Sequence, residues 1–177
     1  ETIKNSLALL QNDLKKNNLD HVKIAAAAEH MIDSNFETIL EKGLLMPLTE
    51  NYLLVEMSYL QPSINFDDAV IKISENNFFP ILAHPERYIY LHQSIDAYTK
   101  FKSKGMLFQL NLLSLDGFYG KDVQRIALKL LEENMIDFVA SDVHNRRQLT
   151  ALKKITLNKE RFKKIVEIIE KTSYNFV

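Results

Sequence analysis

The stretch Phe78-Phe79-Pro80-Ile81-Leu82-Ala83-His84 decides the fold, because it is a short apolar run that ends at a residue able to bind a metal or act in catalysis. Its length and its sharp polar boundary are typical of a buried parallel strand. Four more runs share this design: Val22–Ala28 before Glu29, Tyr52–Val55 before Glu56, Met106–Leu110 before Asn111, and Ile136–Ser141 before Asp142. The five end residues are 27 to 31 positions apart, and no sequence repeat accompanies that spacing. We therefore predict five parallel strands in a periodic architecture.

Amphipathic helices are predicted between these strands. In Lys121–Asn134 the apolar residues recur at helical spacing on one face. Phe66–Asn76 begins after Asn65, a residue type suited to the N-cap position. Four more helices are expected: Ile3–Leu14, Phe36–Lys42 before Gly43, Ala97–Lys104 before Gly105, and one around Phe162–Ile169. Strands that alternate with helices at about 28 residues per unit predict a parallel βα array in the α/β class.

Two folds compete for such an array. An open doubly wound sheet that binds a dinucleotide needs a glycine-rich loop after its first strand. Of the four glycines, only Gly117 and Gly120 lie close together, and they follow the fourth run. A (β/α) barrel places its active residues at the carboxyl ends of successive strands, so we favour the barrel. A closed barrel needs roughly 200 residues or more, so we expect residues 1–177 to form a single barrel-type domain that lacks its N-terminal strands.

Composition narrows the classes of function. The chain has 22 basic and 23 acidic residues and a net charge of -1, which gives no electrostatic case for a nucleic-acid partner. No apolar run approaches the roughly 18 residues that a membrane span needs. Cysteine is absent, which excludes disulfides, thiolate zinc sites and a cysteine nucleophile. The lack of cysteine agrees with a reducing compartment, and we expect a cytoplasmic protein.

Carboxylates and imidazoles stand at the predicted strand ends. Asp142 and His144 are two residues apart, so in an extended segment they point to the same side. Groups of this kind at one barrel mouth suit divalent ions such as Mn, Fe or Zn, and five of them can hold more than one ion. The alternative to metal binding is that these are ordinary polar residues at the positions where loops begin. The candidate ligands are Glu29, Glu56, His84, Asp142 and His144.

Three further residues are candidates for binding substrate. Arg87 lies one short loop beyond His84, where its guanidinium can hold a phosphate through two hydrogen bonds. A salt bridge to Glu86 or another acid is the alternative for Arg87. Arg147 offers a second cation after His144. Asn111 can donate to substrate oxygens or cap the following helix.

Two motifs carry a family resemblance. The segments Ala83-His84-Pro85-Glu86-Arg87-Tyr88 and Ala140-Ser141-Asp142-Val143-His144-Asn145 resemble the metal-dependent tyrosine-protein phosphatases of bacterial capsule and exopolysaccharide operons. That family belongs to the polymerase and histidinol phosphatase superfamily. Supporting stretches are Ala28-Glu29, Leu54-Val55-Glu56, Phe108–Asn111 and Ser114–Gly117, so the resemblance runs from about Val22 to about Arg147.

The resemblance implies a distorted TIM-like (β/α)7 barrel with up to three metal ions, usually manganese or iron. By analogy Glu29 bridges two ions, Glu56 and His84 complete one site, and Asp142 and His144 serve the others. Arg87, with Asp142 and His144, acts in catalysis. The implied reaction is hydrolysis of phosphotyrosine on protein, notably on the tail of a tyrosine kinase that controls polysaccharide chain length. The family's opening strand with its His-x-His ligands lies outside this chain.

Two other functions remain open from the sequence. One is a different phosphoesterase of the same superfamily, such as a histidinol-phosphate phosphatase or a proofreading nuclease. The other is a non-catalytic binding module, because the strand edges of an incomplete barrel favour association with a partner or with a second copy.

Overall fold

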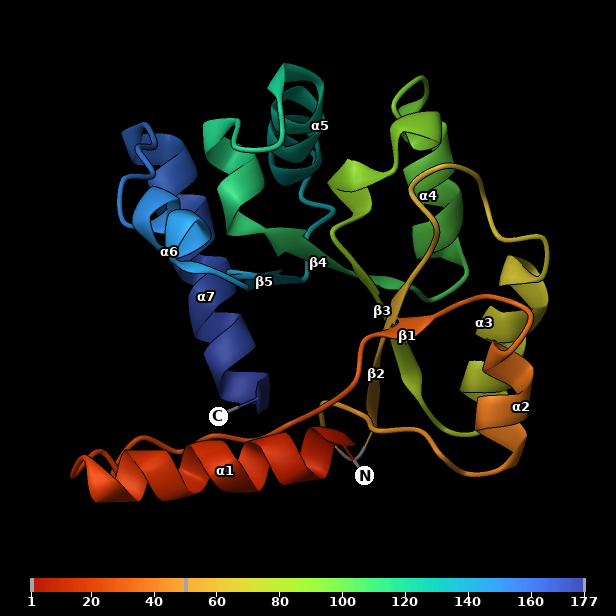
Figure 1. The fold of residues 1–177 in the computed structure, drawn as a ribbon. Helices are drawn as coiled ribbons and strands as arrows, with labels where there is room; N and C mark the ends of the chain where they lie inside the picture. The colour runs from red at the N-terminus through yellow and green to blue at the C-terminus, as the bar shows by residue number, and fades with distance from the viewer. Residues whose placement is uncertain (1, 50, 177) are drawn as a thin grey trace.

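The computed structural model describes residues 2–49 and 51–176 of the chain. Within those residues, five parallel strands form one sheet in the order β1-β2-β3-β4-β5 (Figure 1). The strands are β1 (His30–Met31), β2 (Tyr52–Glu56), β3 (Phe79–Ala83), β4 (Leu107–Asn111) and β5 (Phe138–Ala140). Each strand pairs with its neighbour in sequence, so every connection crosses over in the same direction. All the carboxyl ends therefore lie along one edge of the sheet.

Helices connect the strands as the alternating pattern predicts. The α-helices are α1 (Thr2–Lys16), α2 (Phe36–Glu41), α3 (Phe66–Glu75), α4 (Ile95–Ser103), α5 (Lys121–Glu132), α6 (Arg146–Leu152) and α7 (Lys159–Phe176). Three 3-10 helices, η1 (Pro85–Arg87), η2 (Ile89–Leu91) and η3 (Leu112–Asp116), follow β3 and β4. Every helix expected from the sequence overlaps one of these α-helices. Among the described residues, no helix is both long enough and apolar enough to cross a lipid bilayer.

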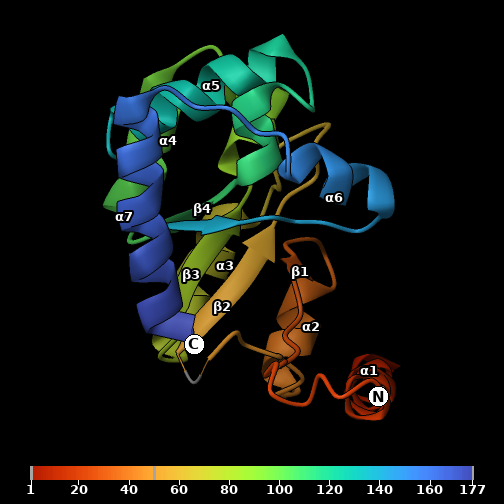
Figure 2. The same cartoon turned by 90° about the vertical axis from the view of Figure 1, so that its left-hand side faces the viewer.

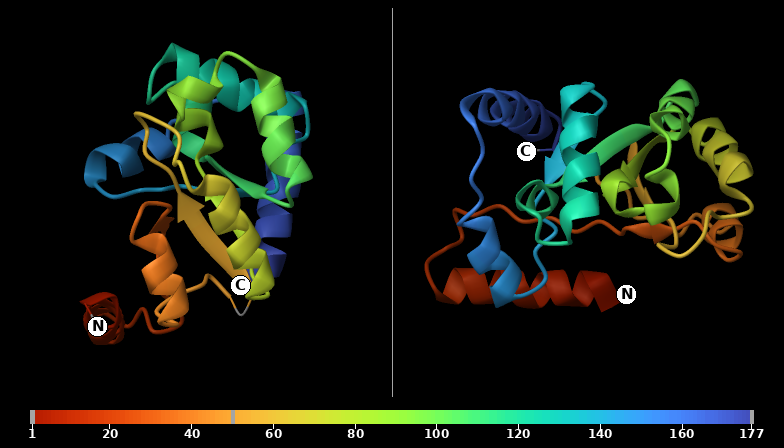
Figure 3. Two further views of the ribbon diagram at one scale, coloured as in Figure 1. Left: turned by 90° about the vertical axis from the view of Figure 1, so that its right-hand side faces the viewer. Right: turned by 90° about the horizontal axis from the view of Figure 1, so that it is seen from above.

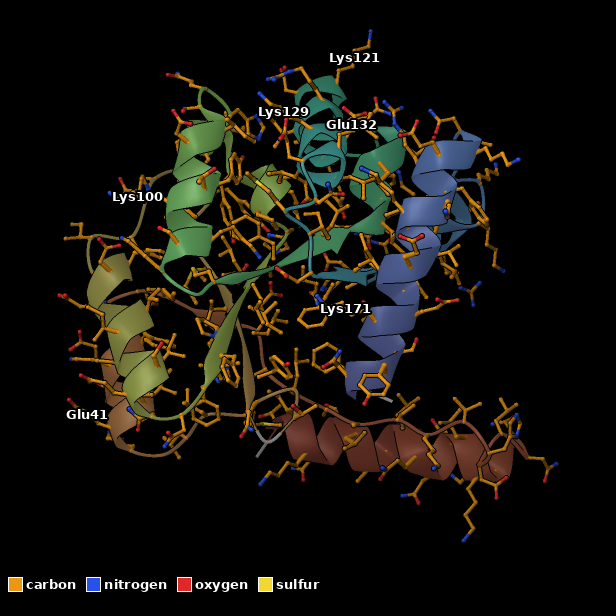
Figure 4. All side chains as sticks on the ribbon, turned by 180° about the vertical axis from the view of Figure 1, so that it is seen from behind. Glu41, Lys100, Lys121, Lys129, Glu132 and Lys171 are labelled. Carbon is orange, nitrogen blue, oxygen red and sulfur yellow. The ribbon has the colours of Figure 1, made fainter. Side chains whose placement is uncertain are left out.

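The hydrophobic core lies between the sheet and the helices that cover one of its faces. Alternate strand residues such as Val55, Leu82 and Phe108 point into it and are fully buried. The predicted apolar face of α5 is confirmed, because Ile126 and Leu130 are buried in the same cluster. Charged side chains of α4 and α5 point outward, as the labelled Lys100, Lys121, Lys129 and Glu132 illustrate (Figure 4). Burial of these apolar stripes fixes the helices on the sheet.

The first helix lies apart from this core. Helix α1 lies beside the extended segment that leads to β1 and on the opposite side of the molecule from α4 and α5 (Figures 2 and 3, left). None of the α1 residues is buried, and Leu9 is 67% exposed. The apolar side chains of α1 therefore do not pack against the main core.

The predicted (β/α)7 barrel is wrong for this structure. A barrel closes only when its first and last strands pair with each other. Here β1 and β5 are the two edges of an open sheet, and the described residues supply five strands. The periodic spacing correctly predicted consecutive parallel strands, but closure depends on pairing between distant segments, which spacing does not specify.

The predicted strand at Val22–Ala28 is also wrong, because regular pairing starts only at His30. The run is extended, and the amide of Ala28 donates to the carbonyl of Met46 at 2.9 Å. A segment forms a strand only where a neighbouring strand offers hydrogen-bond partners along its length. At this edge of the sheet, β2 pairs with only two residues of β1. Apolar composition alone therefore placed the strand too early.

Replacing Leu130 by Ala tests the position of the core. Its side chain is fully buried between α5 and the sheet, so we expect the free energy of unfolding to fall by about 2–5 kcal/mol. Urea denaturation followed by circular dichroism measures this change. The matched control is Ile71→Ala on α3, where the side chain is 57% exposed and the expected change is below about 1 kcal/mol. Equal losses in both variants would contradict this core.

Candidate metal centre

Three side chains converge at the carboxyl edge of the sheet. Glu56 ends β2 and His84 follows β3. Glu29 precedes β1, but the two residues of β1 pair with the last two residues of β2, so Glu29 also lies near this edge. Nε2 of His84 lies 3.0 Å from Oε1 of Glu29 and 3.7 Å from Oε2 of Glu56. One ligand atom from each of the three residues lies within 4.8 Å of the others. Two carboxylates and one imidazole at this separation match the donor set that divalent transition metals prefer.

Backbone conformation marks two of the candidate ligands. Five non-glycine residues have positive φ angles among the described residues, and three of them are asparagines, Asn18, Asn77 and Asn134, in the turns that follow helices. The other two are His84, at φ 36°, and Asp142, at φ 48°. A left-handed conformation costs on the order of 1–3 kcal/mol at a non-glycine residue, although asparagine, aspartate and histidine adopt it more often than other types, and such residues gather at functional sites. The fold therefore holds both ligand candidates in strained conformations.

Electrostatics at the three residues favour a cation. Burial, and then the negative charge of Glu29, raise the pKa of Glu56. The cost of ionising Glu56 comes from two like charges near one another in a partly buried place. A divalent ion between the carboxylates would remove this repulsion. In addition, Nδ1 of the buried His84 has no hydrogen-bond partner among the described residues. The imidazole therefore contacts the two carboxylates through Nε2 alone.

Asp142 joins a separate hydrogen-bonded network beside these residues. Its Oδ2 accepts hydrogen bonds from Arg87 at 3.2 Å and from Nδ2 of Asn111 at 2.8 Å. Nδ1 of His144 lies 3.4 Å from Oδ1 of Asp142, but the ring is 71% exposed, and the backbone of Asp142 is left-handed and not extended as the Asp-x-His prediction assumed. Arg87 therefore pairs with an acid in this structure, and that acid is Asp142 and not Glu86.

A cavity of about 270 Å³ connects the two groups. Its lining includes Glu29, His84, Asn111 and Asp142, so four sequence-predicted residues face one space. The structure does not bring every predicted residue to this space. Arg147 is exposed at the start of α6, where its guanidinium carbon lies 5.3 Å from the centre of the Phe118 ring.

Buried polar contacts fix the floor of the site. Glu86 is fully buried, and its Oε1 accepts from Ser114 at 2.6 Å and from the amide of Asn111 at 3.2 Å. Oδ1 of Asn111 accepts from the amide of Leu113 at 2.9 Å, so Asn111 caps η3 as the capping alternative predicts. Burial raises the pKa of Glu86. These bonds tie the loop after β3 to the end of β4.

Sequence reasoning missed two tyrosines at the site. The hydroxyl of Tyr59 lies 3.2 Å from Nε2 of His84. The rings of Tyr59 and Tyr119 lie 4.6 Å and 4.4 Å from the guanidinium carbon of Arg87. Tyr59 follows Glu56 by three residues, and that closeness to a candidate ligand was the available signal. Nothing local in the sequence connects Tyr119 with Arg87.

The fold and the site define an open parallel α/β sheet with a candidate divalent-metal centre beside an arginine at its carboxyl edge. The family model described as "Capsular polysaccharide synthesis, CpsB/CapC" matches residues 1–171. The chain belongs to this CpsB/CapC family, which agrees with the resemblance inferred from its two motifs.

Individual relatives agree with the family assignment. CapC of Staphylococcus aureus, whose name includes tyrosine-protein phosphatase, is 25% identical over 96% of this chain and 67% of its own length. The tyrosine-protein phosphatase YwqE of Bacillus subtilis is 30% identical over 66% of this chain. The chain spans 46% of the length of YwqE.

A solved structure shares the fold. It comes from a study of YwqE from Bacillus subtilis and CpsB from Streptococcus pneumoniae, which are described there as metal-dependent tyrosine phosphatases. It superposes with a TM-score of 0.78 at 24% identity, and the match covers 99% of this chain and 74% of the solved one.

Replacing Glu56 by Gln separates electrostatic cost from metal binding. Since the pKa of Glu56 is raised in the folded state, its ionised form costs stability at neutral pH, and the cost disappears as the pH falls and Glu56 takes up a proton. We expect the melting temperature of the metal-free protein to stay equal or to rise by about 1–4 °C. We expect the rise on adding Mn²⁺ to be lost, because one ligand is gone.

Glu41→Gln is the matched control, because it removes an exposed carboxylate on α2 away from the site. Differential scanning fluorimetry with and without Mn²⁺ measures both effects. A Glu56→Gln protein that melts lower without metal and keeps its full response to Mn²⁺ would contradict this site.

Proposed function

We propose that the chain forms the core of a cytoplasmic, metal-dependent phosphatase that hydrolyses phosphotyrosine on protein and serves the control of capsular or exopolysaccharide synthesis. The observation that carries the proposal is the convergence of Glu29, Glu56 and His84 within 4.8 Å. Membership of the CpsB/CapC family and the names of CapC and YwqE support the reaction class. The absence of cysteine agrees with a mechanism that has no phosphocysteine intermediate.

Two groups of ligands are proposed to hold the metal. Glu29, Glu56 and His84 bind one divalent ion, while Asp142 and His144 contribute to further ions, up to three in all. We propose manganese, with iron or zinc as the alternatives that the same donors accept. When bound, such ions lower the pKa of coordinated water and neutralise charge on the phosphoryl oxygens.

The chain's own cations and polar groups are proposed to bind the phosphoester. Arg87 is proposed to hold the phosphate beside the cavity, since its guanidinium contacts Asp142, a residue of the cavity lining, at 3.2 Å. Its charge would stabilise the negative charge that grows on the phosphoryl oxygens. Arg147 is proposed as a second cation for the substrate, and Asn111 as a positioning residue whose amide holds Asp142. Asp142 and His144 exchange protons with water at the site.

A phosphotyrosine segment of a bacterial tyrosine kinase tail is the proposed protein partner. A phenolate leaving group has a pKa of about 10, so it leaves with less proton assistance than an alkoxide. Self-association through the open edges of the sheet is proposed as a further property.

The test of this function is hydrolysis of p-nitrophenyl phosphate with added Mn²⁺. We expect turnover that falls about 100-fold or more in His84→Ala and in Arg87→Ala, because a ligand and a phosphate contact are lost. The control is Lys100→Ala, an exposed residue on the outer face of α4 (Figure 4), which should leave turnover unchanged. Turnover that persists in His84→Ala would overturn the assigned site.

Substrate choice separates the phosphatase from its superfamily alternatives. We expect a phosphotyrosine peptide to be hydrolysed with a higher kcat/KM than histidinol phosphate, measured by release of inorganic phosphate. Preference for histidinol phosphate would favour the metabolic phosphatase. Absence of turnover together with stable association in sedimentation experiments would favour a binding module.

A further inference from the structure

Arg87 is flanked by the faces of two tyrosine rings. Its guanidinium carbon lies 4.6 Å from the centre of the Tyr59 ring, in the β2–α3 loop, and 4.4 Å from that of Tyr119, just before α5. Both distances are within the range of a cation–π interaction. The side chain of Arg87 is 22% exposed, so the contacts form in a partly desolvated place. The two rings restrict the conformations of Arg87 before any ligand binds.

The hydroxyl of Tyr119 receives two hydrogen bonds. Nδ2 of Asn111 donates to it at 3.2 Å, and Nε2 of Gln148 donates to it at 3.3 Å. The orientation of each amide is set by a backbone donor on its oxygen. Oδ1 of Asn111 accepts from the amide of Leu113 at 2.9 Å, and Oε1 of Gln148 accepts from the amide of His144 at 2.8 Å. Both NH2 groups must therefore point toward Tyr119.

This arrangement leaves the proton of Tyr119 available. A phenol oxygen has one hydrogen to donate and two lone pairs with which to accept. Both accepting positions are used by the amides of Asn111 and Gln148, and neither NH2 group can accept in return. Within the part of the chain that the structure describes, the O–H group is therefore free to donate to a group other than these two neighbours.

The hydroxyl of Tyr119 and the guanidinium of Arg87 are linked through Asn111 and Asp142. Nδ2 of Asn111 bridges the oxygen of Tyr119 and Oδ2 of Asp142, and the same Oδ2 accepts from Arg87. Thus the donor of Tyr119 and the donor of Arg87 are both adjacent to the pair Asn111 and Asp142, which lines the cavity. An anion held by Arg87 would meet a second donor there.

We propose that Tyr119 is a catalytic residue whose hydroxyl donates a hydrogen bond to a non-bridging oxygen of the phosphoester held by Arg87, while its ring holds Arg87 in place. The inference rests on the proposed phosphatase function. It assigns Tyr119 two separable contributions, one from the hydroxyl and one from the ring. A hydrogen bond to a charged oxygen is stronger than one between neutral groups, so its loss should be measurable.

The experiment compares Tyr119→Phe and Tyr119→Leu with the unsubstituted protein. We expect Tyr119→Phe to lower kcat/KM for p-nitrophenyl phosphate by about 10-fold and to weaken the binding of inorganic phosphate, measured by calorimetry in the presence of Mn²⁺. Tyr119→Leu should lower both further, because Arg87 then loses a ring face as well. Melting temperatures within about 2 °C of the parent confirm that the variants are folded.

Tyr90→Phe is the matched control. The hydroxyl of Tyr90 donates to the carbonyl of Ser58 at 3.1 Å, so its hydrogen is already engaged within the protein. We expect that variant to keep its phosphate affinity and its kcat/KM within about two-fold. Phosphate affinity and turnover in Tyr119→Phe that equal those of the parent would overturn the proposal, and so would an equal loss in Tyr90→Phe.

The two readouts separate this inference from the function on which it rests. A parent protein that binds phosphate but does not turn over the substrate would overturn the phosphatase function. In that case the calorimetric comparison of Tyr119→Phe with the parent still decides whether the hydroxyl contacts the anion. Loss of phosphate affinity in Tyr119→Phe would support that contact, and unchanged affinity would overturn it.

Discussion

Parallel pairing of consecutive strands is the constraint on which the site depends. Because β2, β3, β4 and β5 run in the same direction and pair in sequence order, their carboxyl ends meet along one edge. Glu56, His84, Asn111 and Asp142 come from four different strands or the turns that follow them. His84, Asn111 and Asp142 line one cavity, and Glu56 lies beside His84 in the candidate metal site. The apolar core between the sheet and its helices keeps the strands in register. Burial of residues such as Leu82 therefore positions the site residues indirectly, without contacting them.

The left-handed backbone of His84 shows how strongly its neighbours hold this residue. His84 keeps a left-handed backbone because its amide donates to the carbonyl of Gln109 at 2.8 Å and its carbonyl accepts from the amide of Arg87 at 2.9 Å. The buried Tyr88 donates to the carbonyl of Ala83 at 3.1 Å on the same turn. A cost on the order of 1–3 kcal/mol at one residue is tolerable when several neighbours fix it. The turn directs the imidazole of His84 toward Glu29 and Glu56.

The sequence indicated candidate site residues wherever a polar side chain directly ends or follows a buried strand. Glu56, His84, Asn111 and Asp142 could be predicted because a buried strand leaves a plain signal, a short apolar run with a polar end. The edge at Val22–Ala28 and the closure of the sheet could not, because both depend on which distant segment is available for pairing. Tyr119 could not be predicted either, since its relation to Arg87 arises only when the loops after β3 and β4 fold together.

Under the proposed function, the pairing of Arg87 with Asp142 would couple the binding of metal to the binding of phosphate. In this structure the cation and the anion neutralise each other at 3.2 Å. If Asp142 turns to a metal ion, as we propose, Arg87 loses its counterion and becomes available for a phosphate. If a phosphate takes Arg87, Asp142 in turn gains affinity for a cation. On that proposal each ligand would favour the other through this ion pair, and by linkage the two effects would be equal in free energy.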